Sequence, residues 1–344
     1  MKNVLFIAAI NKGKIPTGGQ EAKNQYMYEY LEAHTQLTAI DTKNWKKRPW
    51  LLFNVIYHLS KNNDVILLHL ATLSAIKVLR IIKLFGKLEI TYYMIVGNWF
   101  PKFIEENRKV IPLLNSLKGL SIEGKKSQKF IQELGVSKIM YHPHFKRIAD
   151  VNYKNGTRES DEIKFVFISR IDTDKGAHIA IESYLKMLHK YPNTKLTLHF
   201  YGKIKDSFKA QFNQYLATVK GLEYRGLIDL SKKENYQKLI DESYYCFLFP
   251  STYYGEGFPG SLIDAMIIGT PIIASDWNLN SEVVHDGVNG LIVPLCSLND
   301  FHNYMEIALL NPDMIRKMSQ NQISRSAQFD TNIVFPQVLQ AAGL

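Results

Sequence analysis

Short apolar segments recur along the whole chain and alternate with longer segments of helical character. The apolar segments are continuous, which is typical of parallel strands buried on both faces of a sheet. Because parallel strands are joined by crossover helices, this order predicts doubly wound α/β domains. The expected strands lie at 4–10, 37–41, 64–70, 88–95, 120–124, 164–169, 195–202, 222–226, 246–250, 271–275 and 290–293.

The length of the chain predicts two such domains. A chain of 344 residues with 46% apolar content exceeds what one hydrophobic core usually holds. The polar segment 150–162 has no apolar period and is rich in turn formers, so we expect it to be a linker. It separates a domain at 1–149 from one at 163–325. Ligands of such sheets bind beyond the carboxyl ends of the strands, here in a cleft that the two domains would face.

An anion-binding bend is predicted in the second domain. Glu256 precedes the glycine-rich bend 257–260, and a short helix is expected at 261–268. Backbone N–H groups at the start of a helix can hold a phosphate. Glu256 and Asp264, with seven residues between them, can reach neutral hydroxyls on either side. A phosphate flanked by two hydroxyl-rich groups describes a sugar nucleotide.

A second motif fits a clamp for that phosphate. A buried strand at 164–169 leads into a loop that holds Arg170 and Lys175, and a helix is expected from Gly176. Cleavage of a sugar–phosphate bond leaves a nucleoside diphosphate. Two cations held over the diphosphate stabilise the charge that develops as the bond breaks.

Two groups of residues have the appearance of metal ligands. Asp172 and Asp174 have the spacing of oxygen ligands for Mg²⁺ or Mn²⁺. We prefer the interpretation that they offset the charges of the loop's cations, which already serve the leaving group, and we expect no metal. His142 and His144 lack Cys or acidic partners at ligand spacing, so we expect no metal there either.

Both motifs, in this order, resemble retaining glycosyltransferases of the GT-B fold, the family-four group known as glycosyl transferases group 1. The segments GEGFPG and IDA resemble the capsular and exopolysaccharide branch of that group. The resemblance implies a GT-B fold of two Rossmann-like domains, with the donor bound by the C-terminal domain and the acceptor by the N-terminal one. It also implies that 326–344 forms a helix that returns to the N-terminal domain.

The resemblance implies a role for each residue of the motifs. Arg170 and Lys175 would hold the diphosphate, and Glu256 would contact the hydroxyls of the donor sugar; these three are the expected catalytic residues. Asp264 would contact the ribose. The other residues expected to bind the donor are Gly18, Gly19, Gly226, Ile228, Gly257, Phe258, Gly260, Ser261, Leu262 and Glu282.

The chain departs from the family pattern at two places. Pro259 has no N–H to give to a phosphate, so Gly260 or Ser261 must supply that donor. Many members carry a histidine in the N-terminal domain near the reacting sugar. This chain has Gly97, Asn98 and Trp99 there, which we expect on the acceptor side.

The resemblance implies transfer of a hexose or hexosamine from a nucleoside diphosphate sugar to a hydroxyl, with retention of the anomeric configuration. The expected donor is a UDP-sugar in preference to a GDP-sugar, and the expected acceptor is a saccharide or a lipid-diphosphate-linked saccharide of surface polysaccharide synthesis. A nucleotide-sugar epimerase of the same two-domain plan is an alternative. A basic nucleic-acid-binding protein is another, disfavoured because the aromatic residues are not interleaved with the charges.

The excess of positive charge lies in the first domain. Residues 1–150 hold 23 Lys and Arg against 11 Asp and Glu, whereas residues 151–344 hold 19 against 21. The segments 44–53 and 77–87 combine basic and apolar residues, which suits helices on an anionic membrane. An ordinary helix with a solvated basic stripe is the alternative. No secretory or membrane-spanning segment is visible, so we expect a cytoplasmic protein, associated with the inner face of the cell membrane if these segments bind it.

Overall fold

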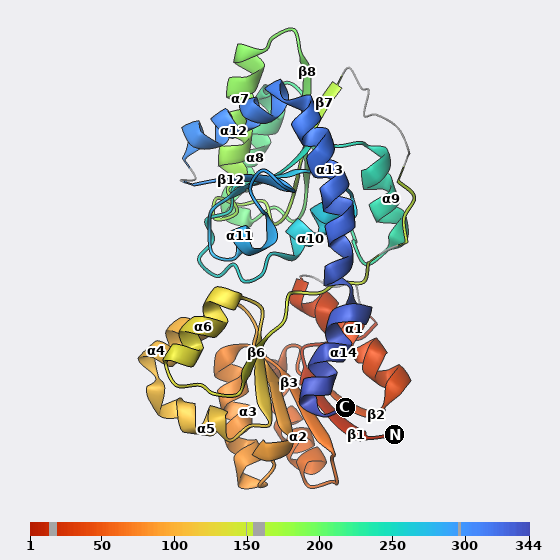
Figure 1. Cartoon of the computed structure of the whole chain (residues 1–344), viewed down its shortest axis with the longest axis vertical. Helices are drawn as coiled ribbons and strands as arrows, with labels where there is room; N and C mark the ends of the chain where they lie inside the picture. Colours follow the sequence, from red (N-terminus) through yellow and green to blue (C-terminus); the bar gives the residue numbers. More distant parts are fainter. Residues whose placement is uncertain (14–18, 149, 154–161, 295–296) are drawn as a thin grey trace. The chain divides into compact units, whose positions relative to one another are not determined.

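The computed structural model divides the chain into two compact units, and Figure 1 shows a sheet in each. The structure describes residues 1–13, 19–148, 150–153, 162–294 and 297–344. One unit comprises Met1–Arg147 and Gln328–Leu344, and the other comprises Ile148–Ala327. Most of the expected linker lies outside the described residues. The chain passes between the units twice, and its last segment belongs to the first unit.

The first unit is built on a sheet of six parallel strands in the order β2-β1-β3-β4-β5-β6. The sheet continues from β1 to β2 on one side and from β3 to β6 on the other, so the direction of winding reverses between β1 and β3. These two strands pair with each other in parallel, and β1 also pairs in parallel with β2. The doubly wound arrangement is therefore confirmed for this unit. The strands are β1 (Asn3–Ala8), β2 (Gln36–Asp41), β3 (Val65–His69), β4 (Thr91–Met94), β5 (Gly119–Ile122) and β6 (Ile139–Tyr141).

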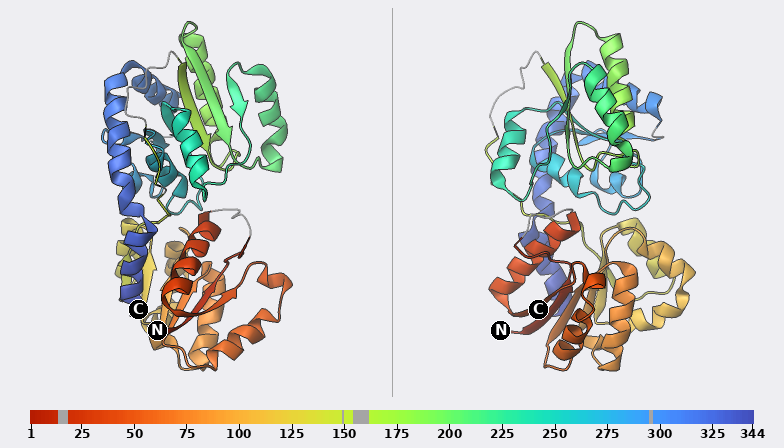
Figure 2. Two further views of the ribbon diagram at one scale, coloured as in Figure 1. Left: turned by 90° about the vertical axis from the view of Figure 1, so that its right-hand side faces the viewer. Right: turned by 180° about the vertical axis from the view of Figure 1, so that it is seen from behind.

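Helices cover both faces of this sheet. Alternate residues of each strand point to opposite faces, so Leu5 and Ile7 pack into one core and Val4 and Phe6 into the other. The first core is covered by α2 to α6 and the second by α1 and α14, which contact each other in Figure 2. The helices are α1 (Gly19–His34), α2 (Leu51–Leu59), α3 (Thr72–Leu84), α4 (Phe100–Glu106), α5 (Ile111–Asn115), α6 (Lys125–Glu133) and α14 (Thr331–Ala342).

A buried polar cluster joins α1 to the carboxyl ends of these strands. The ammonium of Lys23 lies 2.5 Å from Oε1 of Glu123, the residue after β5, and 4.2 Å from the centre of the Phe145 ring. Nδ1 of His144 lies 2.9 Å from the same carboxylate oxygen. Lys23 is only 1% exposed, so the ion pair holds α1 against the sheet within the core rather than on the surface.

Burial sets the ionisation of this cluster. Burial lowers the pKa of His142 to about 3, and the neighbouring Lys23 acts in the same direction. Burial also lowers the pKa of His144, although the neighbouring Glu123 carboxylate acts to raise it. In the unfolded chain these imidazoles take up protons near pH 6.5. The unfolded state therefore binds more protons as the pH falls from about 6.5 towards 3, and the stability of this unit decreases over that range.

The second unit has six parallel strands in the order β12-β11-β10-β7-β8-β9. From β7 the sheet continues through β8 and β9 on one side and through β10, β11 and β12 on the other, so the winding reverses between β7 and β10. Ligands of doubly wound sheets bind at such a switch point. The strands are β7 (Glu162–Ile168), β8 (Lys195–Tyr201), β9 (Leu222–Tyr224), β10 (Cys246–Phe249), β11 (Ile272–Ser275) and β12 (Gly290–Val293).

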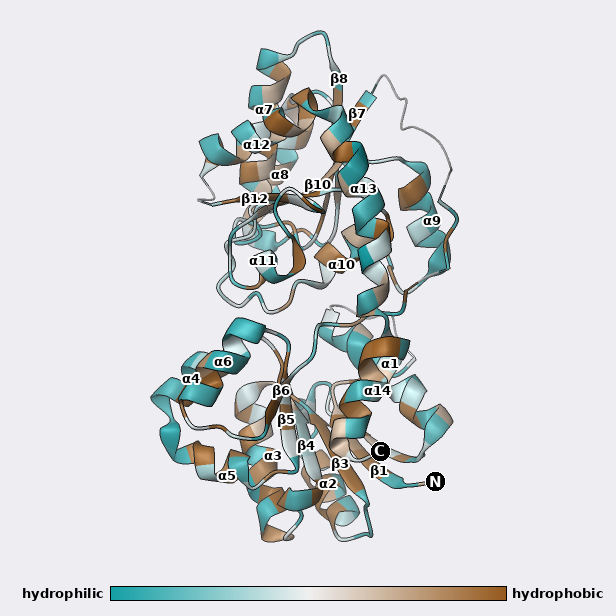
Figure 3. Cartoon of the chain, viewed as in Figure 1, coloured by the Kyte–Doolittle hydropathy of each residue, from teal (hydrophilic) through white to brown (hydrophobic). Residues whose placement is uncertain are grey.

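The helices of the second unit bury one side against this sheet. Figure 3 shows hydrophilic and hydrophobic residues alternating along α7 and α13, as expected of helices with one face on the core. The helices are α7 (Ala177–Lys190), α8 (Asp206–Thr218), α9 (Lys233–Asp241), α10 (Gly260–Ile267), α11 (Asn280–Val283), α12 (Leu298–Leu310) and α13 (Pro312–Ser326).

Two strand predictions differ from the structure. Leu88–Ile90 forms a 3-10 turn, and the strand predicted there begins only at Thr91. The short strand β6 was not predicted. No helix among the described residues combines the length and apolar character needed to cross a bilayer.

We expect Lys23→Met to destabilise the first unit by about 3 kcal/mol, because the change leaves the buried Glu123 carboxylate without its ammonium partner. Lys129→Met, an exposed lysine on α6, is the matched control and should leave the stability unchanged. Differential scanning calorimetry of both variants at pH 7 measures the effect. Equal melting temperatures for the two variants would show that the ion pair adds nothing to stability.

Candidate functional site

Two loops meet at the switch point of the second unit. One follows β7 and carries Arg170 and Lys175, and the other follows β10 and carries Glu256. Gly176 allows them to approach closely, because its φ is +74° and a Cβ there would lie 2.1 Å from the carbonyl oxygen of Pro250. The two predicted motifs, about eighty residues apart in sequence, are thus brought together.

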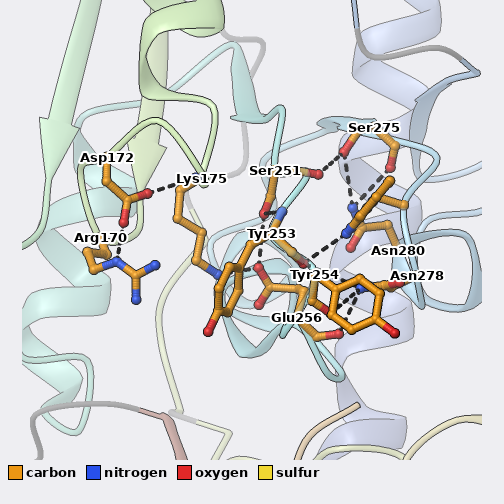
Figure 4. Close-up of polar contacts among 11 residues, drawn as sticks. Arg170, Asp172, Lys175, Ser251, Tyr253, Tyr254, Glu256, Ser275, Asn278 and Asn280 are labelled. Atoms are coloured by element: carbon orange, nitrogen blue, oxygen red, sulfur yellow. Dashed lines mark hydrogen bonds and ion pairs between the residues drawn. The ribbon is translucent and has the colours of Figure 1, made fainter. Parts of the chain in front are cut away.

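Asp172 organises the first loop. Its side chain is completely buried, and Oδ1 accepts a hydrogen bond from the backbone N–H of Lys175 at 2.8 Å. Nε of Arg170 donates to Oδ2. A guanidinium has five N–H groups, so this bond leaves the two terminal nitrogens of Arg170 directed away from Asp172, as Figure 4 shows. The side chain of Arg170 is 40% exposed and can reach a ligand.

Lys175 and Glu256 form an ion pair between the loops. Nζ of Lys175 bonds Oε2 of Glu256, and each side chain is only 11% exposed. The hydroxyl of Ser251 donates to the same carboxylate oxygen at 3.0 Å. The ion pair fixes both side chains at the switch point (Figure 4). Lys175 and Ser251 both bond Oε2 of Glu256, and a carboxylate has a second oxygen that can accept a hydrogen bond from a further donor.

An aromatic ring lies close to both cations. The Tyr253 ring centre is 5.2 Å from the guanidinium carbon of Arg170 and 5.1 Å from Nζ of Lys175. Both distances are within the range of a cation–π interaction. A Cβ on Gly255 would lie 2.7 Å from the ring of Tyr253, so a larger residue there would push the ring out of this position. This role of Tyr253 was not predicted from the sequence.

The loop after β11 holds the Glu256 loop in place. The side-chain amide of Asn278 donates to the carbonyl oxygens of Tyr254 at 3.2 Å and Glu256 at 3.1 Å. Nε1 of Trp277 donates to the carbonyl of Tyr253 at 2.8 Å. Asn278 has a φ of 49°, a conformation that asparagine tolerates better than most residues. These polar residues were not predicted, although they follow a strand end directly.

The glycine-rich bend leads into α10, which begins at Gly260, one residue before the predicted start. The residues of the bend, Gly257 and Phe258, follow Glu256 directly, and Ser261 and Leu262 lie in the first turn of the helix. N–H groups in a first turn have no partner within their own helix. Asp264 is buried, and the hydroxyl of Tyr236 donates to its Oδ1 at 2.5 Å.

The turns after β8 and β9 lie next to the Arg170 loop. The N–H of Gly202 donates to the carbonyl of Gly226 at 2.9 Å. A Cβ on Gly202 would lie 1.9 Å from the carbonyl oxygen of Ser169, which precedes Arg170. Ile228, two residues after Gly226, is half-buried in the same turn. Glu282 lies on the short helix α11 and is also half-buried.

The residues predicted in the N-terminal half belong to the other unit. Gly18 lies outside the described residues, and Gly19 is the first residue of α1. Gly97 has a φ of +74°, and Oδ1 of Asn98 accepts from the hydroxyl of Ser127 at 3.4 Å. Trp99, half-exposed, precedes α4.

The two aspartates of the Arg170 loop share Lys205 as an ion-pair partner, with Nζ of Lys205 4.0 Å from Oδ2 of Asp172. Asp172 also bonds Arg170, and Oδ2 of Asp174 lies 3.4 Å from Nζ of Lys205. Among the described residues there is no group of three or more His, Cys, Asp or Glu placed to hold a metal ion. His142 and His144 belong to the buried cluster around Glu123 of the first unit.

A comparison with known proteins adds to this geometry. A family model described as Glycosyl transferases group 1 matches residues 150–325. The putative glycosyltransferase YtcC of Bacillus subtilis is 26% identical over 167 residues, which is 47% of this chain and 40% of YtcC. The amylovoran biosynthesis glycosyltransferase AmsK of Erwinia amylovora is 24% identical over 136 residues, 38% of this chain and 32% of AmsK. The matched part is less than half of either relative.

Among solved structures, HepE of Anabaena in complex with UDP and glucose superposes with a TM-score of 0.72. The sequence identity is 17%, and the match covers 100% of both chains. This likeness shows the fold, which is the GT-B fold of two Rossmann-like domains, as expected from the sequence.

We expect Lys175→Met to destabilise the second unit by about 3 kcal/mol, because it leaves the buried Glu256 carboxylate without its cation. Adding Glu256→Gln to that variant should restore about half of the loss, since the uncompensated charge is removed. Urea denaturation of the single and double variants measures both changes. A double variant less stable than Lys175→Met alone would contradict the ion pair as the source of the effect.

Proposed function

The chain belongs to the glycosyl transferases group 1 family, and we propose on this premise that it transfers a hexose or hexosamine from a nucleoside diphosphate sugar to a hydroxyl of a saccharide or lipid-diphosphate-linked saccharide. The observation that carries the proposal is the meeting of Arg170, Lys175 and Glu256 at the switch point. Two cations and one carboxylate, positioned by buried partners, match the charges of a diphosphate and the hydroxyls of a sugar.

In this proposal Arg170 and Lys175 serve the leaving group. The exposed terminal nitrogens of Arg170 can form a pair of hydrogen bonds to phosphate oxygens. Lys175 is held in place by Glu256 and by the Tyr253 ring, so little reorganisation is needed as charge develops on the diphosphate. The first-turn N–H groups of Gly260 and Ser261 add donors in place of the missing N–H of Pro259.

Glu256 would hold the sugar rather than attack it. A carboxylate nucleophile must be able to approach the anomeric carbon. Oε2 of Glu256 is engaged by Lys175 and by Ser251, which suits a carboxylate that accepts hydrogen bonds from sugar hydroxyls. The transfer would then retain configuration by attack on the leaving-group face. The bond from the anomeric carbon to the diphosphate oxygen breaks, the bond to the acceptor oxygen forms, and the diphosphate takes the acceptor's proton.

We favour a UDP-sugar as the donor. HepE, which shares the fold, was solved with UDP and glucose. In this chain the backbone groups of the turn at Gly226 and Ile228 would contact the base, Asp264 the ribose, and Glu282 the donor. A role in surface polysaccharide synthesis is supported by the likeness to AmsK, a glycosyltransferase of amylovoran biosynthesis. The protein would act in the cytoplasm, where nucleotide sugars are made.

We expect the protein to bind UDP more tightly than GDP, with an affinity that EDTA does not change, because the cations of the site replace a metal. Arg170→Ala and Lys175→Ala should each lower turnover by about a hundredfold, as loss of one oxyanion donor does. Lys209→Ala, an exposed lysine on α8, is the control and should keep wild-type turnover. Isothermal calorimetry and a UDP-release assay measure these effects. UDP binding that disappears in EDTA would instead give Asp172 and Asp174 a metal.

We expect the anomeric configuration of the donor to be kept in the product, because Oε2 of Glu256 is engaged by Lys175 and Ser251 and the carboxylate would bind sugar hydroxyls rather than attack the anomeric carbon. The coupling constant of the product's anomeric proton, measured by NMR, reports the configuration. A reaction that proceeds without acceptor and yields an epimer of the donor would identify an epimerase of the same fold. An inverted product would exclude the same-face mechanism.

A further inference from the structure

Helix α2 of the first unit exposes a row of large apolar side chains. Its inward side packs against the sheet as expected of an amphipathic helix, since Leu51, Val55 and Leu59 are buried in the core. Its outward side carries aromatic residues that the core does not use: Phe53 is 73% exposed, Trp50 57% and Tyr57 55%. The neighbouring residues Leu52 and Ile56 are exposed as well. Such a cluster on the surface of one helix indicates a contact with something outside the chain.

Helix α3 places basic residues beside this row. Both helices cover the same face of the sheet, because their inward residues belong to one core cluster, so their outward sides face the same way. Nζ of Lys87, after α3, bonds the carbonyl of Lys61, after α2, which ties the two ends together. The exposed residues of α3 are Leu73, Lys77, Arg80, Lys83 and Leu84.

Almost no negative charge interrupts this surface. Between residues 44 and 87 the sequence has eight Lys and Arg and one acidic residue, Asp64. Oδ2 of Asp64 accepts a hydrogen bond from the backbone N–H of Asn3 at 2.7 Å and is therefore occupied at the start of β1. The surface is positive and apolar at once. We call it the α2–α3 surface and define it by Trp50, Phe53, Tyr57, Lys77, Arg80 and Lys83.

The structure corrects one expectation from the sequence about how this region would meet a membrane. The apolar residues of segment 77–87 were expected to face it, but Val78 and Ile82 are buried against the sheet. The middle of the exposed side of α3 is therefore a basic stripe of Lys77, Arg80 and Lys83. Leu73 and Leu84 are exposed at the two ends of α3, and the exposed aromatic groups come from the α2 segment, which the bond between Lys87 and Lys61 ties to α3.

We propose that the α2–α3 surface binds the headgroup region of an anionic phospholipid bilayer. Aromatic side chains with a polar edge, such as Trp50 and Tyr57, favour the boundary between headgroups and acyl chains. The cations of α3 would lie against lipid phosphates, where each Lys or Arg adds to the attraction. A protein partner would need an acidic patch interleaved with apolar residues, whereas a bilayer surface offers both everywhere. The inference goes beyond the sugar transfer and does not depend on it.

The test is co-sedimentation of the full chain with vesicles. Wild-type protein should bind vesicles with about 30% phosphatidylglycerol and bind pure phosphatidylcholine much more weakly, and about 0.5 M salt should reduce the binding. Trp50→Ser with Phe53→Ser, and separately Lys77→Glu with Arg80→Glu, should each lower the vesicle partition coefficient by about tenfold or more. The matched control is Lys209→Glu with Leu310→Ser, an exposed cation and an exposed apolar residue of the second unit, which should bind like wild type.

Two results would overturn the proposal. One is wild-type protein that does not bind the anionic vesicles. The other is a wild-type dimer, seen by light scattering, that Trp50→Ser with Phe53→Ser converts to a monomer without altered vesicle binding, which would assign the surface to a second copy of the chain. Calorimetric titration of the same variants with UDP measures whether the proposed donor site of the other unit still binds UDP. Loss of vesicle binding with UDP binding intact is therefore distinguishable from failure of the proposed function.

Discussion

The second unit depends on one ion pair, between Lys175 and Glu256. Each side chain leaves a different loop, and the two loops follow strands that are neighbours only because the winding of the sheet reverses there. Without this bond, two opposite charges would be buried separately, at a cost of several kcal/mol each. Asp172 holds the backbone on one side of the pair, and Ser251 and Asn278 hold the other. The fold and the site are therefore stabilised by the same contacts.

Each unit contains a buried lysine–glutamate pair at the carboxyl end of its sheet, but the two pairs have different surroundings. In the first unit, Lys23 and Glu123 are covered by α1, and burial holds the nearby histidines in their neutral form. In the second unit, the exposed guanidinium of Arg170 lies beside the pair, across the Tyr253 ring. The two pairs carry the same charges but differ in their access to solvent. The pair beside Arg170 can therefore contact a ligand, whereas the Lys23–Glu123 pair holds a helix in place.

The sequence allowed the sheets and the two motifs of the site to be predicted, because both depend on local pattern. Continuous apolar strands are recognisable one at a time, and glycines beside an acidic residue mark a bend where the backbone can approach a ligand closely. The strand β6 was missed, and Leu88–Ile90 was misassigned because the apolar residues of a short 3-10 turn before a strand resemble the strand itself. The roles of Asp172, Tyr253 and Asn278 could not be predicted, since each acts through a partner set by tertiary contact.

The place of α14 has a consequence for how the chain folds as it is made. Val334, Phe335 and Val338 of this helix complete one of the two cores of the first unit, although the rest of that unit ends at Arg147. During synthesis the second unit, which is continuous in sequence, has all of its strands before α14 emerges from the ribosome. Until α14 is made, one face of the sheet in the first unit stays partly uncovered. Of the two units, the one whose strands are made earlier is therefore the one that finishes folding later, and its apolar face stays open to chaperones for that interval.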